Sequence, residues 1–254
     1  MAIKTRNMIK FFRKIRYDLM EKNKTGKYFK YAIGEIVLVV IGILIAIQLN
    51  EWRNDLVNNK QKQKVLLALK SDFEENITRL DTVFNHQEKS FFKFLKSKDL
   101  IDSINYVTDK LVLKENLRHG GYGYSFSPIN GALRSAISSG DIHLINDERL
   151  TKLLFSWEDL VLDSYEEVEL LRSYGSDPYV RLIHSYAQAR EIGRKSPNKN
   201  RSNHPSNFVG IFKDPLFENY TQQMIYYSYQ YMEELKVIRI NNLEIIELID
   251  RELK

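Results

Sequence analysis

Histidine is the residue type in this sequence best suited to acid–base or metal chemistry, and its five copies are scattered. None lies beside a second histidine or a carboxylate at a metal-ligand spacing such as His-Glu-x-x-His. The chain has no cysteine, which excludes disulfides, thiolate metal sites and a cysteine nucleophile. The sequence therefore predicts no catalytic residue, no metal site, no cofactor and no enzymatic activity. The histidines are His86, His119, His143, His184 and His204.

A second place for chemistry is the glycine-rich stretch at residues 118–128. His119-Gly120-Gly121 is similar to the oxyanion loop of esterases, but the Gly-x-Ser-x-Gly turn that carries their nucleophile is missing. The glycine spacing also differs from that of phosphate loops and dinucleotide-binding turns. We interpret the stretch as an aromatic loop that packs on a helical bundle, with backbone positions that glycine occupies at low cost.

Glu35 is the third candidate, because it lies inside an otherwise apolar stretch. Residues 31–49 are interrupted only by Glu35 and Gln48. A helix of about 20 apolar residues crosses the ~30 Å hydrocarbon core of a bilayer, so the stretch predicts a transmembrane helix. A carboxylate there is costly unless it is protonated, paired or turned towards another helix. We favour a polar contact with a second helix over a proton- or ion-linked role, since no second span completes a pathway.

Five residues of this predicted span share one face. Their spacing of 3, 4, 3 and 4 is the repeat of a left-handed coiled coil. The last two form a small-xxx-small pair, which lets two backbones approach closely, although such a pair also occurs by chance. The pattern predicts a homo-oligomer, or association with a partner membrane protein, through this seam. The seam residues are Ala32, Glu35, Val39, Gly42 and Ala46.

Charge orients the predicted span. Residues 1–30 carry ten Lys and Arg and two acidic residues, a net of +8, so the rest of the chain carries −3 of the total +5. Residues 50–70 carry five basic residues. Basic flanks stay on the cytoplasmic side, which predicts a single-pass inner-membrane protein with a cytoplasmic N-terminus and a periplasmic C-terminal domain. A cleaved signal peptide is the alternative, but 47–49 offers no small-residue cleavage site. Because the positive charge belongs to a tail, nucleic acid is not expected as a partner.

Residues 8–20 alternate apolar and basic side chains at helical spacing. A basic amphipathic helix of this kind lies in the headgroup region of a bilayer, which makes lipid the expected partner. A partly ordered tail that only sets the topology is the alternative. The residues predicted to lie at the membrane surface are Phe11, Phe12, Arg13, Lys14 and Ile15.

The remainder predicts helices, so the expected fold is all-α. It comprises a cytoplasmic basic amphipathic segment (1–26) that contains the interfacial amphipathic helix, one transmembrane helix (27–53) and an extracytoplasmic helical bundle (54–254). Residues 50–95 contain no Gly and no Pro, so the span is expected to continue into a long helix with a polar hinge near 58–64. The bundle is expected to use helices 60–97 and 214–252 with shorter helices between them.

Local signals place those shorter helices. They are expected at 111–117, at 128–139 with Gly140 after its end, from Asn146 or Asp147 to about 173, and at 179–192 after a break at 175–178. The last helix begins at Asp214-Pro215 and carries an apolar stripe. Tyr226 and Tyr229 fall off that stripe, where they contact a partner or cover aromatic residues of the first long helix. The stripe is Tyr220, Met224, Tyr227, Tyr231, Leu235, Ile238, Ile245 and Ile249.

Two blocks of sequence, 31–52 after 8–15 and then 132–146, resemble an uncharacterised family of bacterial single-span proteins. The resemblance implies an inner-membrane protein of a double-membrane bacterium and carries no activity. The expected function is a membrane-anchored interaction or scaffold protein that self-associates through its span. A sensory accessory protein, whose bundle binds a ligand and signals through a partner, is the alternative.

Overall fold

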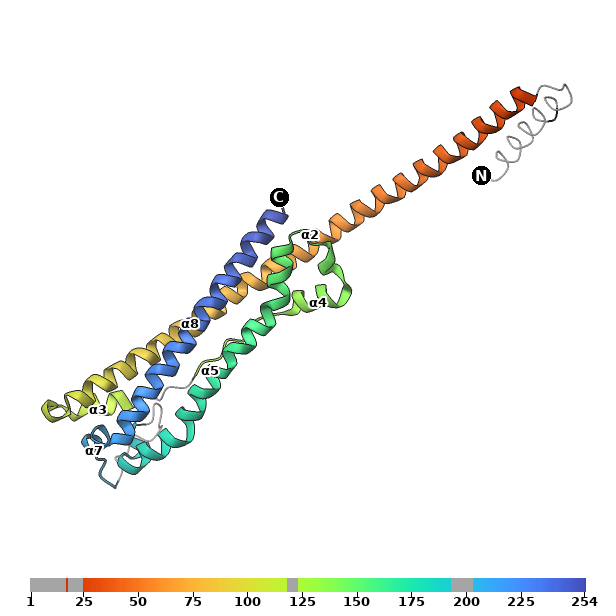
Figure 1. The fold of residues 1–254 in the computed structure, drawn as a ribbon. Helices are drawn as coiled ribbons and strands as arrows, with labels where there is room; N and C mark the ends of the chain where they lie inside the picture. Colours follow the sequence, from red (N-terminus) through yellow and green to blue (C-terminus); the bar gives the residue numbers. More distant parts are fainter. Residues whose placement is uncertain (1–16, 18–24, 118–122, 193–202) are drawn as a thin grey trace. The chain divides into compact units, whose positions relative to one another are not determined.

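The computed structural model describes residue 17 and residues 25–117, 123–192 and 203–254. Their regular structure is helical, without a strand in the described ranges, which confirms the all-α prediction. Three helices are long (Figure 1): α2 (Thr25–Asp102), α5 (Glu148–Tyr186) and α8 (Pro215–Glu252). The shorter helices are α3 (Lys110–Leu117), α4 (Gly131–Ser139), α6 (Ala189–Ile192) and α7 (Phe208–Phe212), with 3-10 turns at Ile104–Tyr106 and Asp141–Leu144.

Contacts divide the chain into two compact units, Met1–Gln61 and Lys62–Lys254. The division falls within the polar portion of α2 at 58–64, where the backbone stays helical. In the first unit, every residue from 36 to 60 is exposed, although 36–47 is entirely apolar. By length and composition α2 is a candidate membrane span among the described residues, and its most apolar window is not buried within the chain.

The second unit has its own core, built from stripes on the three long helices. Side chains at helical spacing turn inward from each helix, and the removal of their apolar surface from water stabilises the bundle. Rings from different helices meet there: Phe73 of α2 packs edge-on against Trp157 of α5, with centroids 5.0 Å apart. The predicted stripe on α8 is confirmed, since all of its residues are buried except the half-buried Tyr227.

Three predicted helix ends are also confirmed. The Asp147 carboxylate accepts a hydrogen bond from the Leu150 N–H (2.8 Å) and caps α5. Asp214 does the same for the Leu216 N–H (2.8 Å) at the start of α8. Gly140 ends α4 with φ of 78°, in the left-handed region that glycine adopts at little cost. Local chemistry therefore sets these boundaries.

The predicted break at 175–178 is wrong, because α5 runs through Pro178 to Tyr186. A proline inside a helix removes one hydrogen bond and usually ends or kinks it. Here the inward stripe continues past it with Gly175, Tyr179 and Ile183 buried, and Tyr179 stacks on Tyr220 of α8 at 4.4 Å. Tertiary packing keeps this turn helical. As a result α5 has 39 residues, so it is a third long helix and not one of the shorter helices expected between α2 and α8.

Candidate functional site

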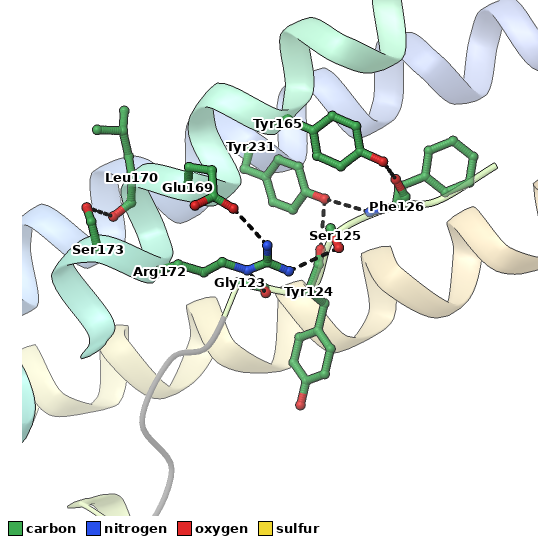
Figure 2. A network of polar contacts seen from close by, with 10 residues as sticks. All are labelled: Gly123, Tyr124, Ser125, Phe126, Tyr165, Glu169, Leu170, Arg172, Ser173 and Tyr231. Carbon is green, nitrogen blue, oxygen red and sulfur yellow. Dashed lines mark hydrogen bonds and ion pairs between the residues drawn. The ribbon is translucent and has the colours of Figure 1, made fainter. Parts of the chain in front are cut away.

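The most distinctive feature of the bundle is residues 123–130, which have neither helical nor strand structure and lie among α2, α5 and α8 (Figure 2). We call these residues the extended segment. Its first residue, Gly123, is buried against α5. A Cβ at this position would lie 2.7 Å from Val168 Cγ2 and 3.1 Å from the Val168 carbonyl oxygen, so only glycine allows this close approach. For residues 123–128, the part of the glycine-rich stretch that the structure describes, the expectation of a loop that packs on the bundle is thereby confirmed.

Side chains from two helices hold the backbone of Phe126. The Tyr231 hydroxyl of α8 accepts a hydrogen bond from the Phe126 N–H (3.3 Å) and donates one to the Tyr124 carbonyl (2.8 Å). From α5, the Tyr165 hydroxyl donates to the Phe126 carbonyl at 2.9 Å. Figure 2 shows both hydroxyl groups pointing toward the Phe126 backbone. Burial raises the pKa of Tyr231 well above its ordinary value, so its hydroxyl keeps the proton that it donates.

Arg172 of α5 binds the start of the extended segment. Its Nε donates to the Gly123 carbonyl at 3.3 Å, and its Nη2 donates to the Ser125 hydroxyl at 3.0 Å. Its Nη1 forms an ion pair with Glu169 at 2.8 Å, one turn earlier on the same helix. The guanidinium group has several donors in a fixed plane, which lets one side chain bind these three partners at once.

Asn76 of α2 holds the other end. Its Nδ2 donates to the Ile129 carbonyl (2.9 Å) and its Oδ1 accepts from the Ile129 N–H (2.7 Å), so the side-chain amide pairs with one residue of backbone. The Asn130 side chain accepts from the Trp157 indole N–H at 3.0 Å. These contacts occupy residues 128–130, and α4 therefore begins at Gly131 instead of at Pro128 as predicted.

The extended segment is held along its backbone by the chain's own helices. Helices α2, α5 and α8 each supply side chains that bond to its backbone N–H or C=O groups. The groups that could act chemically, including Tyr165 and Arg172, are engaged in holding that backbone. His86 stacks on the Tyr124 ring at 4.7 Å, and within the described residues no group of three His, Asp or Glu side chains could hold a metal ion. The described contacts position the extended segment against the three helices.

A pair of carboxyl groups lies beside the segment, between α5 and α8. Glu167 and Glu234 interact through their side chains, and the Oε2 atom of each is buried without an N–H or O–H donor from the described residues. Burial, then the hydrogen bond and charge of Glu167, raise the pKa of Glu234 to about 7. Nearby Asp163 and Glu166 act in the same direction. The pair therefore retains a proton at pH values below about 7.

The predicted seam residues lie on the first part of α2. Ala32 and Glu35 are half-buried, whereas Val39, Gly42 and Ala46 are exposed. They share one helix face, as the spacing predicts, and self-association through it stays a prediction. The predicted membrane-surface residues Phe11, Phe12, Arg13, Lys14 and Ile15 lie outside the described residues.

Sequence reasoning missed the residues that hold the extended segment and the carboxyl pair. One signal was available: Asn76 occupies a position in the apolar stripe of Leu69, Phe73 and Leu80, and it is fully buried. A buried amide needs partners, so a polar residue on an apolar stripe points to a tertiary hydrogen bond. Tyr231 was placed on its stripe correctly, but only the structure shows its hydroxyl contacts. Off that stripe, Tyr226 and Tyr229 are both about half exposed, at 54% and 51%.

Comparison with known protein families finds a match to part of the chain. Residues 35–159 match the sequence model of a family of unknown function (DUF6090). The matched region contains most of the predicted span, Asn76, the extended segment, α4 and the start of α5. No curated protein and no solved structure matches the chain. The resemblance to an uncharacterised family is thus supported over about half of the chain, without an activity to transfer.

Proposed function

We propose that this chain is a membrane-anchored interaction protein that self-associates through its span and carries its helical bundle outside the cytoplasm. The observation that carries the proposal is the apolar surface of α2, on which residues 36–47 are both apolar and exposed. Water-exposed apolar surface of that extent is costly, whereas the hydrocarbon core of a bilayer accommodates it. The proposed location is the inner membrane of a bacterium, with the N-terminus in the cytoplasm. The proposed role is non-catalytic.

Orientation is tested with reporter fusions after Lys254. A reporter that is active only outside the cytoplasm should be active there, since ten basic residues precede the span and five follow it within 50–70. The matched control is a reporter that is active only in the cytoplasm, fused at the same place, which should be silent. The reverse result would overturn both the orientation and the compartment.

Self-association is tested with two glycines of the same helix. A Cβ at Gly34 or at Gly42 meets nothing within 4 Å, so Ile at either position leaves the fold of the chain unchanged. Only Gly42 belongs to the seam. Gly42→Ile should abolish cross-linking between spans, and Gly34→Ile should have little effect, because close approach requires small side chains at the contact. Because the chain has no cysteine, a single Leu49→Cys gives an unambiguous disulfide cross-link.

The outcomes of that experiment are distinct. Glu35→Gln should reduce cross-linking only partly, since an amide still forms an inter-helix hydrogen bond worth about 1 kcal/mol. Equal sensitivity at Gly34 and Gly42 would place the contact on another face. A native span that does not cross-link at all would remove self-association from the proposal and would leave Glu35 to a different partner.

The surface role of residues 8–20 is tested with a peptide of residues 1–22. It should bind vesicles that contain anionic lipid, because burial of apolar side chains and attraction of basic side chains act together. Replacement of Phe11, Phe12 and Ile15 by Ser should abolish the binding. A native peptide that does not bind such vesicles would leave this segment with no membrane-surface role.

A further inference from the structure

The Glu167–Glu234 pair joins α5 to α8 through two acidic side chains. The groups that act most strongly on Glu234 are themselves acidic: Glu167, Asp163 and Glu166 of α5. No basic side chain among the described residues donates to either buried Oε2 atom. Two carboxylates in such surroundings repel when both are ionised, and they attract through a hydrogen bond when one holds a proton. The interaction between the two helices at this pair is therefore attractive when one carboxyl holds a proton and repulsive when both are ionised.

Two basic side chains on the same two helices are engaged with other partners. Arg172 of α5 is bonded to Glu169, the Gly123 carbonyl and the Ser125 hydroxyl. Lys236 of α8 forms an ion pair with Glu233 and is also influenced by Glu88 of α2. The titratable groups beside Tyr231 are Tyr165, Arg172 and Glu234 itself. The extended segment contributes one titratable side chain, Tyr124, which stacks on His86 of α2.

The carboxyl pair lies at the level where α5 and α8 hold the extended segment. Glu234 follows Tyr231 by three residues, about one turn of α8, and Glu167 lies between Tyr165 and Arg172 on α5. Phe126 is bonded to Tyr165 of one helix and to Tyr231 of the other. If α5 and α8 move apart here, Phe126 cannot keep both hydrogen bonds, because they come from different helices. The extended segment is then no longer held from both sides.

We propose that Glu167 and Glu234 form a protonation-dependent latch, which holds α5 against α8 over the extended segment when the pair retains a proton and releases the segment when both carboxyls are ionised. The latch belongs to the second unit and does not depend on the proposed span. Because burial and the neighbouring carboxylates raise the pKa of Glu234 in the folded protein above its ordinary value of 4.5, the latch is strongest at pH values below 4.5. Its contribution is lost as the pH rises through about 7. The bundle thus gains a means of responding to the pH of its surroundings.

Tryptophan emission and hydrogen exchange test the latch in the full chain, held in detergent micelles. The indole N–H of Trp157 donates a hydrogen bond to the Asn130 side chain, and its ring packs edge-on against Phe126 with centroids 6.4 Å apart. The emission of Trp157 therefore reports on the extended segment. The chain has two tryptophans, and Trp52→Phe leaves Trp157 alone. Between pH 5 and pH 9 the emission should change with a midpoint near 7, the value given by the carboxyl pair. Exchange of the amides in 123–130, corrected for its intrinsic pH dependence, should accelerate over the same range.

Three variants separate the latch from general pH effects. Glu234→Gln removes the titrating group whose pKa is raised and keeps a hydrogen-bonding side chain, so it should abolish the emission change. Glu167→Gln removes the charge that repels Glu234 but not the burial that also raises its pKa, so it should lower the midpoint of the change. In both variants, exchange of the amides in 123–130 at pH 8 should be several-fold slower than in the native protein. Glu233→Gln, next to the pair but bonded to Lys236, should keep the native transition. The proposal is overturned if the native protein shows no transition, or if both Gln variants that fold retain it with an unchanged midpoint.

Discussion

The two parts of α2 are both rich in apolar side chains, but they distribute them differently. Residues 36–47 present apolar groups on all faces and leave them exposed, whereas beyond Lys62 one stripe of apolar residues is buried, including Leu66, Leu69 and Phe73. A stripe on one face is typical of a helix that packs on a protein core, and an all-round apolar surface is typical of a helix in lipid. One continuous helix therefore shows how the distribution of apolar residues, not their number, distinguishes the two environments.

The largest expected effect comes from cavity formation in the bundle. Phe73→Ala removes a buried ring that packs on Trp157, and we expect it to lower the free energy of unfolding by about 3 to 5 kcal/mol. Leu44→Ala is the matched control, because that side chain is exposed. It should leave the unfolding of the bundle unchanged. Denaturant titration in micelles, followed by circular dichroism, measures the stability of both variants. Equal destabilisation by the two substitutions would contradict the distinction between the two parts of α2.

An added charge should affect the first part of α2 strongly and the second part little, the reverse of the alanine substitutions. Ile43→Arg places a guanidinium in the proposed span, at a cost of about 2.5 to 3.5 kcal/mol for insertion into the membrane. Leu67→Arg adds the same charge to the other part of α2, where the side chain is 57% exposed, and should be tolerated. The fraction of protein that stays with membranes after an alkaline wash gives the comparison. If the Ile43→Arg protein stays with the membranes to the same extent as the Leu67→Arg protein, residue 43 does not lie in a membrane span.

Glycines extend the comparison to backbone packing. Gly123→Ala forces a methyl group against Val168 and should destabilise the bundle by about 1 to 3 kcal/mol, as overpacking does. Gly42→Ala adds the same methyl group where nothing lies within 4 Å, so the midpoint of bundle unfolding should not move. The measurement is thermal unfolding of the full chain. An unaffected Gly123→Ala protein would mean that the extended segment does not need its close approach to α5.

The smallest effect is expected from one hydroxyl group. Tyr231→Phe leaves the Phe126 N–H without its acceptor and should cost about 1 to 2 kcal/mol of stability. Tyr229→Phe, on an exposed position of the same helix, should change stability by less than about 0.5 kcal/mol. Exchange of the Phe126 amide distinguishes this local loss from a general one. Unchanged protection of that amide in Tyr231→Phe would show that the hydroxyl does not hold the segment.

Some features of this protein follow from the sequence alone because their physical causes are local. The apolar surface of 31–49, the caps at Asp147 and Asp214 and the glycine at 140 depend on residues within a turn or two of one another. The stripe of α8 follows from the 3.6-residue period of the helix. Each was predicted at the correct place, and each uses interactions that an isolated stretch of chain already contains.

Other features were decided only by tertiary structure. The helix continues through Pro178 because Tyr179 packs on Tyr220 of α8. The extended segment depends on partners far along the chain: Asn76 is 53 residues from Ile129, and Tyr231 is 105 residues from Phe126. The carboxyl pair likewise needs two helices to meet. No periodicity or local propensity encodes such pairings, since their energy arises only when the folded bundle removes both partners from water.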